Sequence, residues 1–359
     1  MLEAIKGFIN WLSAPYYFVT LSILIVAAML RWKGWVKPRP FLLIFCGFGL
    51  YFFLSCLDPN FLIIVAKADN LPIAGMLFLV IFFVWLALRQ AFDNDERIAA
   101  GKVPNEAEES RDKLLCWPHL VYTEFICLIL FTVLLLGWSI LVQAPIEQPA
   151  NLTDSPNPSK APWYFLGLQE MLVYYDPWIA GVLLPSYIII GLMAIPYIDT
   201  NPKGNGYYTF RERRWEISVF MFGFVVLWIM LIILGTFLRG PNWNFFGPYQ
   251  YWDIHKVEPL VNIHLSEIIW VKMLNMGLPS SMWVREMFGI VIVLAYILVL
   301  PFVLKRWGLK RFYDKMGPMR YHVMVNLFLV MMSLPIKMYL RWAFNFKYVV
   351  NLPEIFFNI

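Results

Sequence analysis

Long apolar segments separated by polar connections dominate the chain. Each segment runs for about 18–23 residues without the alternation of apolar and polar positions that marks a membrane strand. A helix of about 20 residues crosses the roughly 30 Å hydrocarbon core of a bilayer. The pattern therefore predicts spanning helices at residues 8–30, 40–57, 71–88, 121–142, 177–198, 215–237, 287–304 and 323–340.

Composition agrees with this pattern. Of the 359 residues, 60% are hydrophobic and only 15% are charged, whereas soluble domains carry about 45–50% and about 25%. The 18% of aromatic residues suits a chain with many membrane–water interfaces, where amphipathic rings gather. Residues 1–10 lack a basic region followed by a small-residue cleavage site, so we expect no cleavable signal peptide.

Positive charge alternates between successive connections. The first, third, fifth and seventh connections are basic, whereas the second, fourth and sixth are poor in Lys and Arg. Because cytoplasmic loops carry the excess of Lys and Arg, the pattern places both termini and the fourth connection on the outer face. The basic residues are Arg31, Lys33, Lys37 and Arg39; Arg89, Arg97, Lys102, Arg111 and Lys113; Lys203, Arg211, Arg213 and Arg214; and Lys305, Arg306, Lys310, Arg311, Lys315 and Arg320.

The connections divide the chain into four parts. The third connection is long and mixed in charge, and we interpret residues 93–114 as a cytoplasmic linker. It separates a three-helix N-terminal membrane extension, residues 1–92, from a central domain at 115–240. An outer loop with a two-helix membrane extension occupies 241–359. The fold class is therefore all-α: a polytopic transmembrane helical bundle with about eight spanning helices.

One outer connection combines a proline–aromatic turn with a carboxylate, in the run KAPWYFLGLQE from Lys160 to Glu170. At the outer membrane edge, a carboxylate can accept a proton from a lipid-soluble quinol, and a phenol can donate a hydrogen bond to it. In this interpretation Glu170 accepts a proton from the quinol. The alternative is that Glu170 is a solvated carboxylate, or one bonded to a backbone amide. In the same interpretation Tyr164 donates a hydrogen bond to the quinone. The alternative is that Tyr164 is an interfacial tyrosine.

Three landmarks carry a family resemblance. Trp117-Pro118 stands just before a predicted span, the run PNPSKAPWYF occupies residues 156–165, and Ile195-Pro196-Tyr197 ends the next span before a basic turn. From 117 to 239 the chain resembles the C-terminal part of the cytochrome b family, which is the separate subunit IV in bf complexes. The last two predicted helices resemble a bacterial extension, and the first three match no family known to us.

The resemblance implies a quinol pocket in the fourth connection. The family's Pro-Glu-Trp-Tyr motif falls here on residues that keep its Trp and Tyr but place Pro162 where the family has its glutamate. Glu170 follows about two helical turns later, and we expect it to point back into the same pocket and replace the missing carboxylate. The implied pocket residues are Pro162, Trp163, Tyr164, Phe165 and Leu166, with Trp163 otherwise a packing residue.

The histidines and cysteines predict no metal site on this chain. The 4 Cys are scattered without a CxxC pair, which excludes the usual patterns for zinc, iron–sulfur and c-type haem. None of the 4 His lies inside a predicted span: His119 and His322 stand at inner helix ends, and His255 and His264 in one outer loop. Cytochrome b holds its two haems through four histidines on two spanning helices, so the resemblance implies haem b on a separate subunit.

By resemblance, the chain is a subunit of a bc-type quinol:cytochrome c oxidoreductase, respiratory or photosynthetic, and is inactive alone. Quinol oxidised at the outer face would give electrons to a Rieske [2Fe–2S] protein and to haem b of the partner, releasing protons outside. Expected partners are that haem-binding subunit, the Rieske protein, a c-type cytochrome and membrane lipids, with no nucleic acid. The complex would be a dimer in a bacterial cytoplasmic membrane. The alternative is a quinone-binding anchor or a non-catalytic scaffold of another electron-transfer complex.

Three smaller expectations concern the outer face. Asp176 precedes Pro177 and should cap the fifth spanning helix. Lys337 and Arg341 should extend their charged ends from the eighth helix to the interface. Residues 261–276 should form an interfacial helix.

Overall fold

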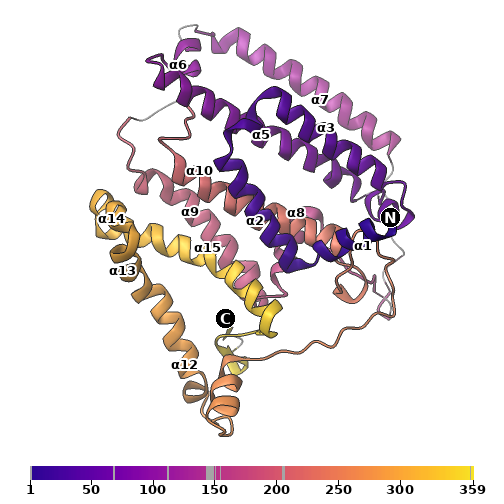
Figure 1. Ribbon diagram of the computed structural model, residues 1–359, viewed down its shortest axis with the longest axis vertical. Helices are drawn as coiled ribbons and strands as arrows, with labels where there is room; N and C mark the ends of the chain where they lie inside the picture. Colours follow the sequence, from indigo (N-terminus) through magenta and orange to yellow (C-terminus); the bar gives the residue numbers. More distant parts are fainter. Residues whose placement is uncertain are drawn as a thin grey trace.

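The computed structural model describes residues 2–67, 69–110, 113–142, 149, 151–153, 155–203, 207–355 and 357–359. Arg111, one of the basic residues of the third connection, lies outside this range, as do parts of the outer connection before α8. Long helices dominate the fold, and the two strands form one small hairpin near the C-terminus (Figure 1).

The N-terminal part contains α1 (Leu2–Leu12), α2 (Pro15–Arg31), the 3-10 turn η1 (Lys33–Val36), α3 (Pro38–Ser55), α4 (Pro59–Val65), α5 (Leu71–Ala99) and α6 (Asn105–Glu109). The central part contains η2 (Cys116–Leu120), α7 (Val121–Leu141), α8 (Trp163–Met171), η3 (Ile179–Leu183), α9 (Leu184–Ile198), α10 (Arg214–Met221), η4 (Phe222–Ile229), α11 (Met230–Ile233), η5 (Leu234–Leu238) and the 3-10 turn η6 (Pro241–Trp243). The C-terminal part contains η7 (Glu267–Met273), α12 (Met282–Leu294), η8 (Ala295–Val299), α13 (Leu300–Leu304), η9 (Lys305–Leu309), α14 (Lys310–Met316), α15 (Pro318–Phe344), β1 (Asn351–Leu352), the 3-10 turn η10 (Pro353–Ile355) and β2 (Phe357–Asn358). The other η segments are short π-helical stretches.

The predicted fold class is confirmed. Among the described residues, 7 helices are long and apolar enough to span a membrane, and a bent pair would make 8. That pair, α1 and α2, replaces the straight span predicted at 8–30 and is bent by 84°. The bend follows from Pro15, which has no backbone N–H and drives Ala14 out of the helical region, to φ −56° and ψ 140°.

Two other predicted boundaries differ from the structure. Helix α5 continues to Ala99, well past the predicted end at 88, because its last turns pack on the loop after α9: Asn94 donates to the carbonyl of Tyr208, and Asp95 accepts from the backbone of Arg211. The interfacial helix predicted at 261–276 is only the short π-helix η7.

The hydrophobic core forms where α2, α5, α8, the η4–α11 segment and α15 meet. Tyr174, Leu231 and Met338 are almost completely buried there. Trp85 on α5 stacks on Phe41 with 4.0 Å between ring centroids, which ties α3 to α5. The core therefore holds α8, the helix after the proline–aromatic turn, against the end of the η4–η5 span.

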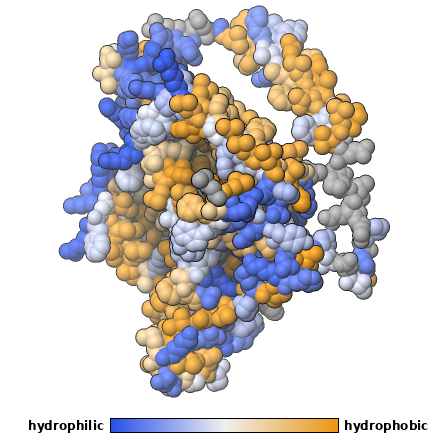
Figure 2. Space-filling view, turned by 45° about the vertical axis from the view of Figure 1, so that its right-hand side comes forward, coloured by the Kyte–Doolittle hydropathy of each residue, from blue (hydrophilic) through white to orange (hydrophobic). Residues whose placement is uncertain are grey.

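Helix α7 buries no side chain in the described structure. Figure 2 shows it as an arm of hydrophobic surface at the upper right, between grey segments. Its exposed aliphatic residues can face lipid, or the helices of another subunit, without cost.

The C-terminal segment folds over the C-terminal end of α15, and it overturns one prediction. Lys337 and Arg341 do not reach the interface, because they are 4% and 7% exposed. The ammonium of Lys337 donates to the carbonyl of Lys347, and Arg341 donates to the carbonyls of Val261 and Asn345, both at 3.0 Å. Main-chain carbonyls thus replace the water that these cations would otherwise seek.

The capping role of Asp176 is confirmed. Its Oδ1 accepts the backbone N–H of Trp178 at 3.2 Å, and its main-chain carbonyl accepts from Ala180. Its second oxygen accepts from Asn358 at 2.9 Å, which ties the C-terminal hairpin to the start of the fifth span.

Candidate functional site

The chain before α8 is held in place by one side chain of the helix itself. Gln169 accepts from the backbone N–H of Ala161 at 2.8 Å and donates to the carbonyl of Ser159 at 2.9 Å. Pro162 stands at the N-cap position in an extended conformation, and its carbonyl accepts from Phe165. A proline suits this position because the first N–H groups of a helix have no partner within it. The turn is therefore fixed relative to the helix.

A second clamp joins this turn to the loop after η5. Asn157 donates to the side chain of Asn242 at 2.9 Å and accepts from its backbone N–H at 2.7 Å. Asn242 has φ 56°, a left-handed conformation that asparagine tolerates better than most residues, and it also donates to the carbonyls of Ile254 and Lys256. The connection before α8 and the loop after η5 therefore form one layer.

A cavity of about 250 Å³ lies beside the N-terminus of α8, and we call it the α8 cavity. Its lining combines the proline–aromatic turn with the start of α5. The lining residues are Asp69, Asn70, Pro72, Ile73, Lys160, Ala161, Pro162, Trp163 and Leu166. Three of the five predicted pocket residues therefore lie in its wall: Pro162, Trp163 and Leu166. Tyr164 and Phe165 do not; they are 49% and 52% exposed on the first turn of α8.

The expected orientation of Glu170 is wrong. Its side chain is 0% exposed and is absent from the lining of the α8 cavity. Arg239 binds it with both ends of the guanidinium, at 2.7 Å and 3.0 Å, and Tyr174 donates to it at 3.0 Å. It is therefore neither solvated nor bonded to a backbone amide, the two other possibilities.

Helix geometry explains this orientation. The buried face of α8 contains Leu166, Gly167, Glu170 and Met171, the i, i+1, i+4 and i+5 spacing of one helical stripe. That stripe packs on α11 and η5. At Gly235 of η5, an added Cβ would lie 2.9 Å from the Leu166 side chain. The close approach brings Glu170 to the end of η5, where Arg239 follows.

Charge and burial shape this ion pair. Burial alone would lower the pKa of Arg239, but the Glu170 carboxylate outweighs burial and raises it. The pKa of Tyr174 is raised well above its usual value, chiefly by burial and then by the charge of Glu170. Both groups keep their protons at any physiological pH. Sequence reasoning overlooked Arg239, although a lone basic residue directly after an apolar segment on the charge-poor face is a signal for it.

Lys160 is the second residue that sequence reasoning overlooked. Its ammonium donates to the carbonyl of Thr236 at 2.8 Å and lies 5.0 Å from the ring centroid of Trp252. Burial, assisted by the charge of Lys67, lowers the pKa of Lys160 to about 7. The carboxylates of Asp69 and Glu170 act in the opposite direction. One residue in the lining of the α8 cavity therefore carries a titratable amine.

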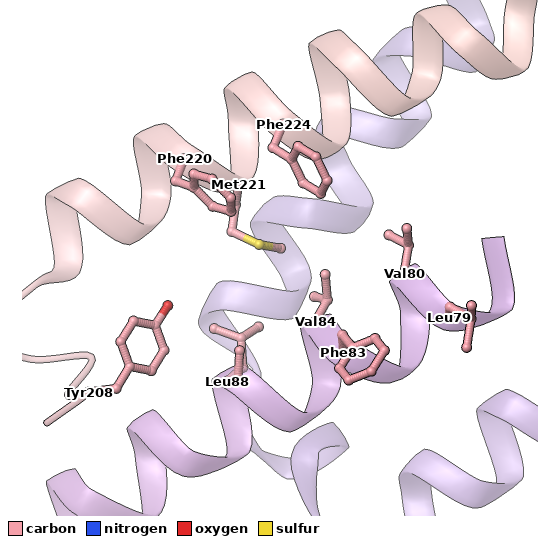
Figure 3. A pocket seen from close by; sticks show the side chains of 10 residues that line it. Leu79, Val80, Phe83, Val84, Leu88, Tyr208, Phe220, Met221 and Phe224 are labelled. Carbon is pink, nitrogen blue, oxygen red and sulfur yellow. The ribbon is translucent and has the colours of Figure 1, made fainter. Parts of the chain in front are cut away.

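A larger, apolar cavity of about 320 Å³ lies between α5 and the α10–η4 segment. Figure 3 shows Phe220, Met221 and Phe224 facing α5, with Tyr208 at one end. The lining residues are Leu79, Val80, Phe83, Val84, Ala87, Leu88, Tyr208, Phe220, Met221 and Phe224. The Tyr208 hydroxyl is the only polar side-chain group in this lining, so the cavity lacks groups that would orient a reacting molecule.

Two of the four histidines pack against aromatic rings. His264 stacks on Tyr348 with centroids 5.3 Å apart, and His322 packs against Phe302 and Tyr321. Burial lowers the pKa of His264, whose Nδ1 is buried without a hydrogen-bond partner. Within the part of the chain that the structure describes, no three His, Cys, Asp or Glu side chains converge on a common point.

Comparison with known proteins bears on the same region. Residues 149–251 match the family model described as cytochrome b (C-terminal)/b6/petD. A menaquinol:cytochrome c reductase cytochrome c subunit from Geobacillus thermodenitrificans is 26% identical over 121 residues, which cover 31% of this chain and 48% of that protein. The protein of the same name from Bacillus subtilis (strain 168) is 30% identical over 109 residues, 29% of this chain and 40% of that protein.

The chain therefore spans less than half the length of these curated relatives. No solved structure matches it. The cytochrome b resemblance is confirmed for residues 149–251, which contain the proline–aromatic turn, all of α8 and Arg239. The first three predicted spans lie outside that match. The third of them, α5, nevertheless lines the α8 cavity with its start.

Proposed function

We propose that this chain is a membrane subunit of a bc-type quinol:cytochrome c oxidoreductase and that its α8 cavity forms part of the outer-face quinol oxidation site. One observation carries the proposal: the cavity adjoins the proline–aromatic turn inside the segment that matches the cytochrome b family. The name shared by the two relatives makes menaquinol the quinol to test first.

The chemistry of the cavity suits a quinol head group. Its volume, about 250 Å³, is below the usual lower bound of about 300 Å³ for ligand sites. That size favours a flat ring over a whole prenylated molecule. Pro162, Leu166 and Ile73 supply apolar wall, whereas Lys160 and Asp69 supply polar groups that can bond to the quinol oxygens.

The predicted site residues take different roles in this proposal. Trp163, with 41% of its surface exposed, stands between the cavity and the outer surface. Tyr164 and Phe165 project from the same turn and complete the pocket only when a partner subunit covers them. Glu170 holds α8 on Arg239, and it acts as a proton acceptor only if that ion pair opens.

Haem b and the Rieske cluster belong to partner subunits in this proposal. The wide exposure of α7 supports a missing neighbour in the membrane, namely the haem-binding subunit. This chain would supply position, an apolar wall and proton-handling groups, and the partners' metal centres would supply the electron chemistry.

The native complex, purified by a tag on this chain, tests the proposal. We expect it to contain b-type haem, a Rieske protein and quinol:cytochrome c reductase activity.

Ala161→Phe should fill the cavity and lower kcat/KM by about tenfold or more, a loss of at least about 1.4 kcal/mol of binding. Ser155→Phe adds the same side chain at an exposed position of the same connection, outside the cavity lining, and is the matched control. Activity unchanged by Ala161→Phe would refute the assignment.

The alternative function is a non-catalytic scaffold. Two observations favour it: Pro162 stands where the family has its carboxylate, and the nearby Glu170 is tied to Arg239. A purified complex without Rieske protein or quinol oxidation would support this alternative.

A further inference from the structure

Lys160 occupies an unusual position for a lysine. Of the described residues that line the α8 cavity, it is the only cation. It lies two positions before Pro162, the residue that replaces the family's glutamate. Its ammonium is anchored by the Thr236 carbonyl and the Trp252 ring, which fixes a side chain that forms part of the cavity lining.

The charged groups around Lys160 come from three other elements. Lys67 and Asp69 lie in the connection between α4 and α5, Glu170 lies on α8, and Arg239 follows η5. Burial and the two cations favour the neutral amine, whereas the two carboxylates favour the ammonium. Glu170 and Arg239 largely cancel each other because they form a bidentate ion pair. Both forms of Lys160 are therefore populated near neutral pH, as a pKa of about 7 requires.

We propose that the neutral amine of Lys160 accepts the first proton of a quinol bound in the α8 cavity, in place of the family's carboxylate. This inference rests on the proposed function. A neutral amine keeps its hydrogen bond to Thr236 through one N–H and still offers a lone pair to the quinol hydroxyl.

The quinol O–H bond breaks, its proton forms a new N–H bond on Lys160, and the electron pair stays on the quinol oxygen. The resulting quinolate then gives one electron to a Rieske-type iron–sulfur cluster and one to a haem b, both on partner subunits. The second quinol proton leaves to another acceptor or to water. No further oxidant is needed.

Asp69 gives the proton a way out. It lines the same cavity, is exposed, and interacts electrostatically with Lys160. Protonated Lys160 can pass its proton through this carboxylate to outer water. The N-terminal extension, which lies outside the family match, then supplies part of the proton path.

Lys160→Arg is the decisive variant. Arginine keeps the charge and the hydrogen-bond donors but is never neutral in a protein. In the purified complex, we expect kcat for quinol oxidation to fall by about 100-fold, the low end of general acid–base effects. KM should stay within about threefold. Lys67→Arg, a nearby exposed lysine, is the matched control and should behave like wild type.

The pH profile separates proton transfer from a structural role. In the wild type, kcat should rise with pH through about 7, because only the neutral amine accepts a proton. That rise should disappear in Lys160→Arg and in Lys160→Gln. A flat wild-type profile between pH 6 and 8 would overturn the inference without any variant. So would a Lys160→Arg complex with wild-type kcat and pH profile.

The cavity-filling variant keeps the two proposals distinguishable. If Ala161→Phe abolishes activity while Lys160→Arg has no effect, the quinol site stands and the role of Lys160 fails. If Ala161→Phe has no effect, the site itself is wrong, and the role of Lys160 fails with it.

Discussion

Breaking the Glu170–Arg239 ion pair should destabilise this subunit strongly. The Glu170 side chain is 0% exposed and that of Arg239 11% exposed, and two hydrogen bonds join them. Removal of either partner leaves the other as a desolvated charge. In Glu170→Leu, Arg239 keeps the carbonyl of Trp243 and the nearby Tyr174 hydroxyl, but no carboxylate that balances its charge. In Arg239→Met, Glu170 keeps only the Tyr174 hydroxyl.

The magnitude follows from the cost of an unpaired buried charge. Each single variant should lose about 3–5 kcal/mol of unfolding free energy. The double variant, Glu170→Leu with Arg239→Met, removes both charges, and buried pairs replaced by apolar residues are often neutral in stability. It removes one partner each from the Tyr174 hydroxyl and the Trp243 carbonyl, at about 1 kcal/mol for each group. We therefore expect the double variant to be more stable than either single variant.

Unfolding of the purified complex in detergent is the assay, analysed as a double-mutant cycle. The pair of half-buried Lys256 and exposed Glu258 is the control, and Glu258→Gln should cost less than about 1 kcal/mol. Additive losses in the cycle would refute the reasoning. Glu170→Gln separates the structural role of the pair from a catalytic role. Because Lys160 is the proposed proton acceptor, we expect this variant to lose stability. Wild-type stability combined with slow quinol oxidation would instead identify Glu170 as the proton acceptor.

Three further predictions follow from particular positions. Gly289→Ala should loosen the C-terminal segment and speed its proteolysis, because an added Cβ would lie 2.1 Å from a backbone carbonyl, whereas Gly308→Ala, with open space, should not. Because burial lowers the pKa of His264, the unfolded state binds the extra proton, so stability should fall as pH drops below about 6.5. In His264→Phe, which keeps the ring stack on Tyr348, melting curves should show a smaller fall in stability over the same pH range than in the wild type. In a cysteine-free background, an impermeant thiol reagent added outside should label a cysteine at Glu258 but not one at Lys310; the reverse result would contradict the predicted topology.

The sequence alone determined the fold class and the positions of most of the long apolar helices. The hydrocarbon core requires a minimum length of apolar helix, so spans are visible without any tertiary contact. Local rules also placed the cap at Asp176 and the aromatic turn at Trp163, because a proline or a cap acts through its immediate neighbours. The family resemblance likewise rested on a contiguous run of residues, at 156–165.

Tertiary structure decided the partners of the charged residues. Helical periodicity states which face of α8 carries Glu170, but not that Arg239, 69 residues later, meets that face. Nor does any local pattern bring Asp69 to the cavity beside Lys160, or place the carbonyl of Lys347 at the ammonium of Lys337. These contacts depend on how distant segments pack, and a buried charge takes whichever partner the packing brings within reach.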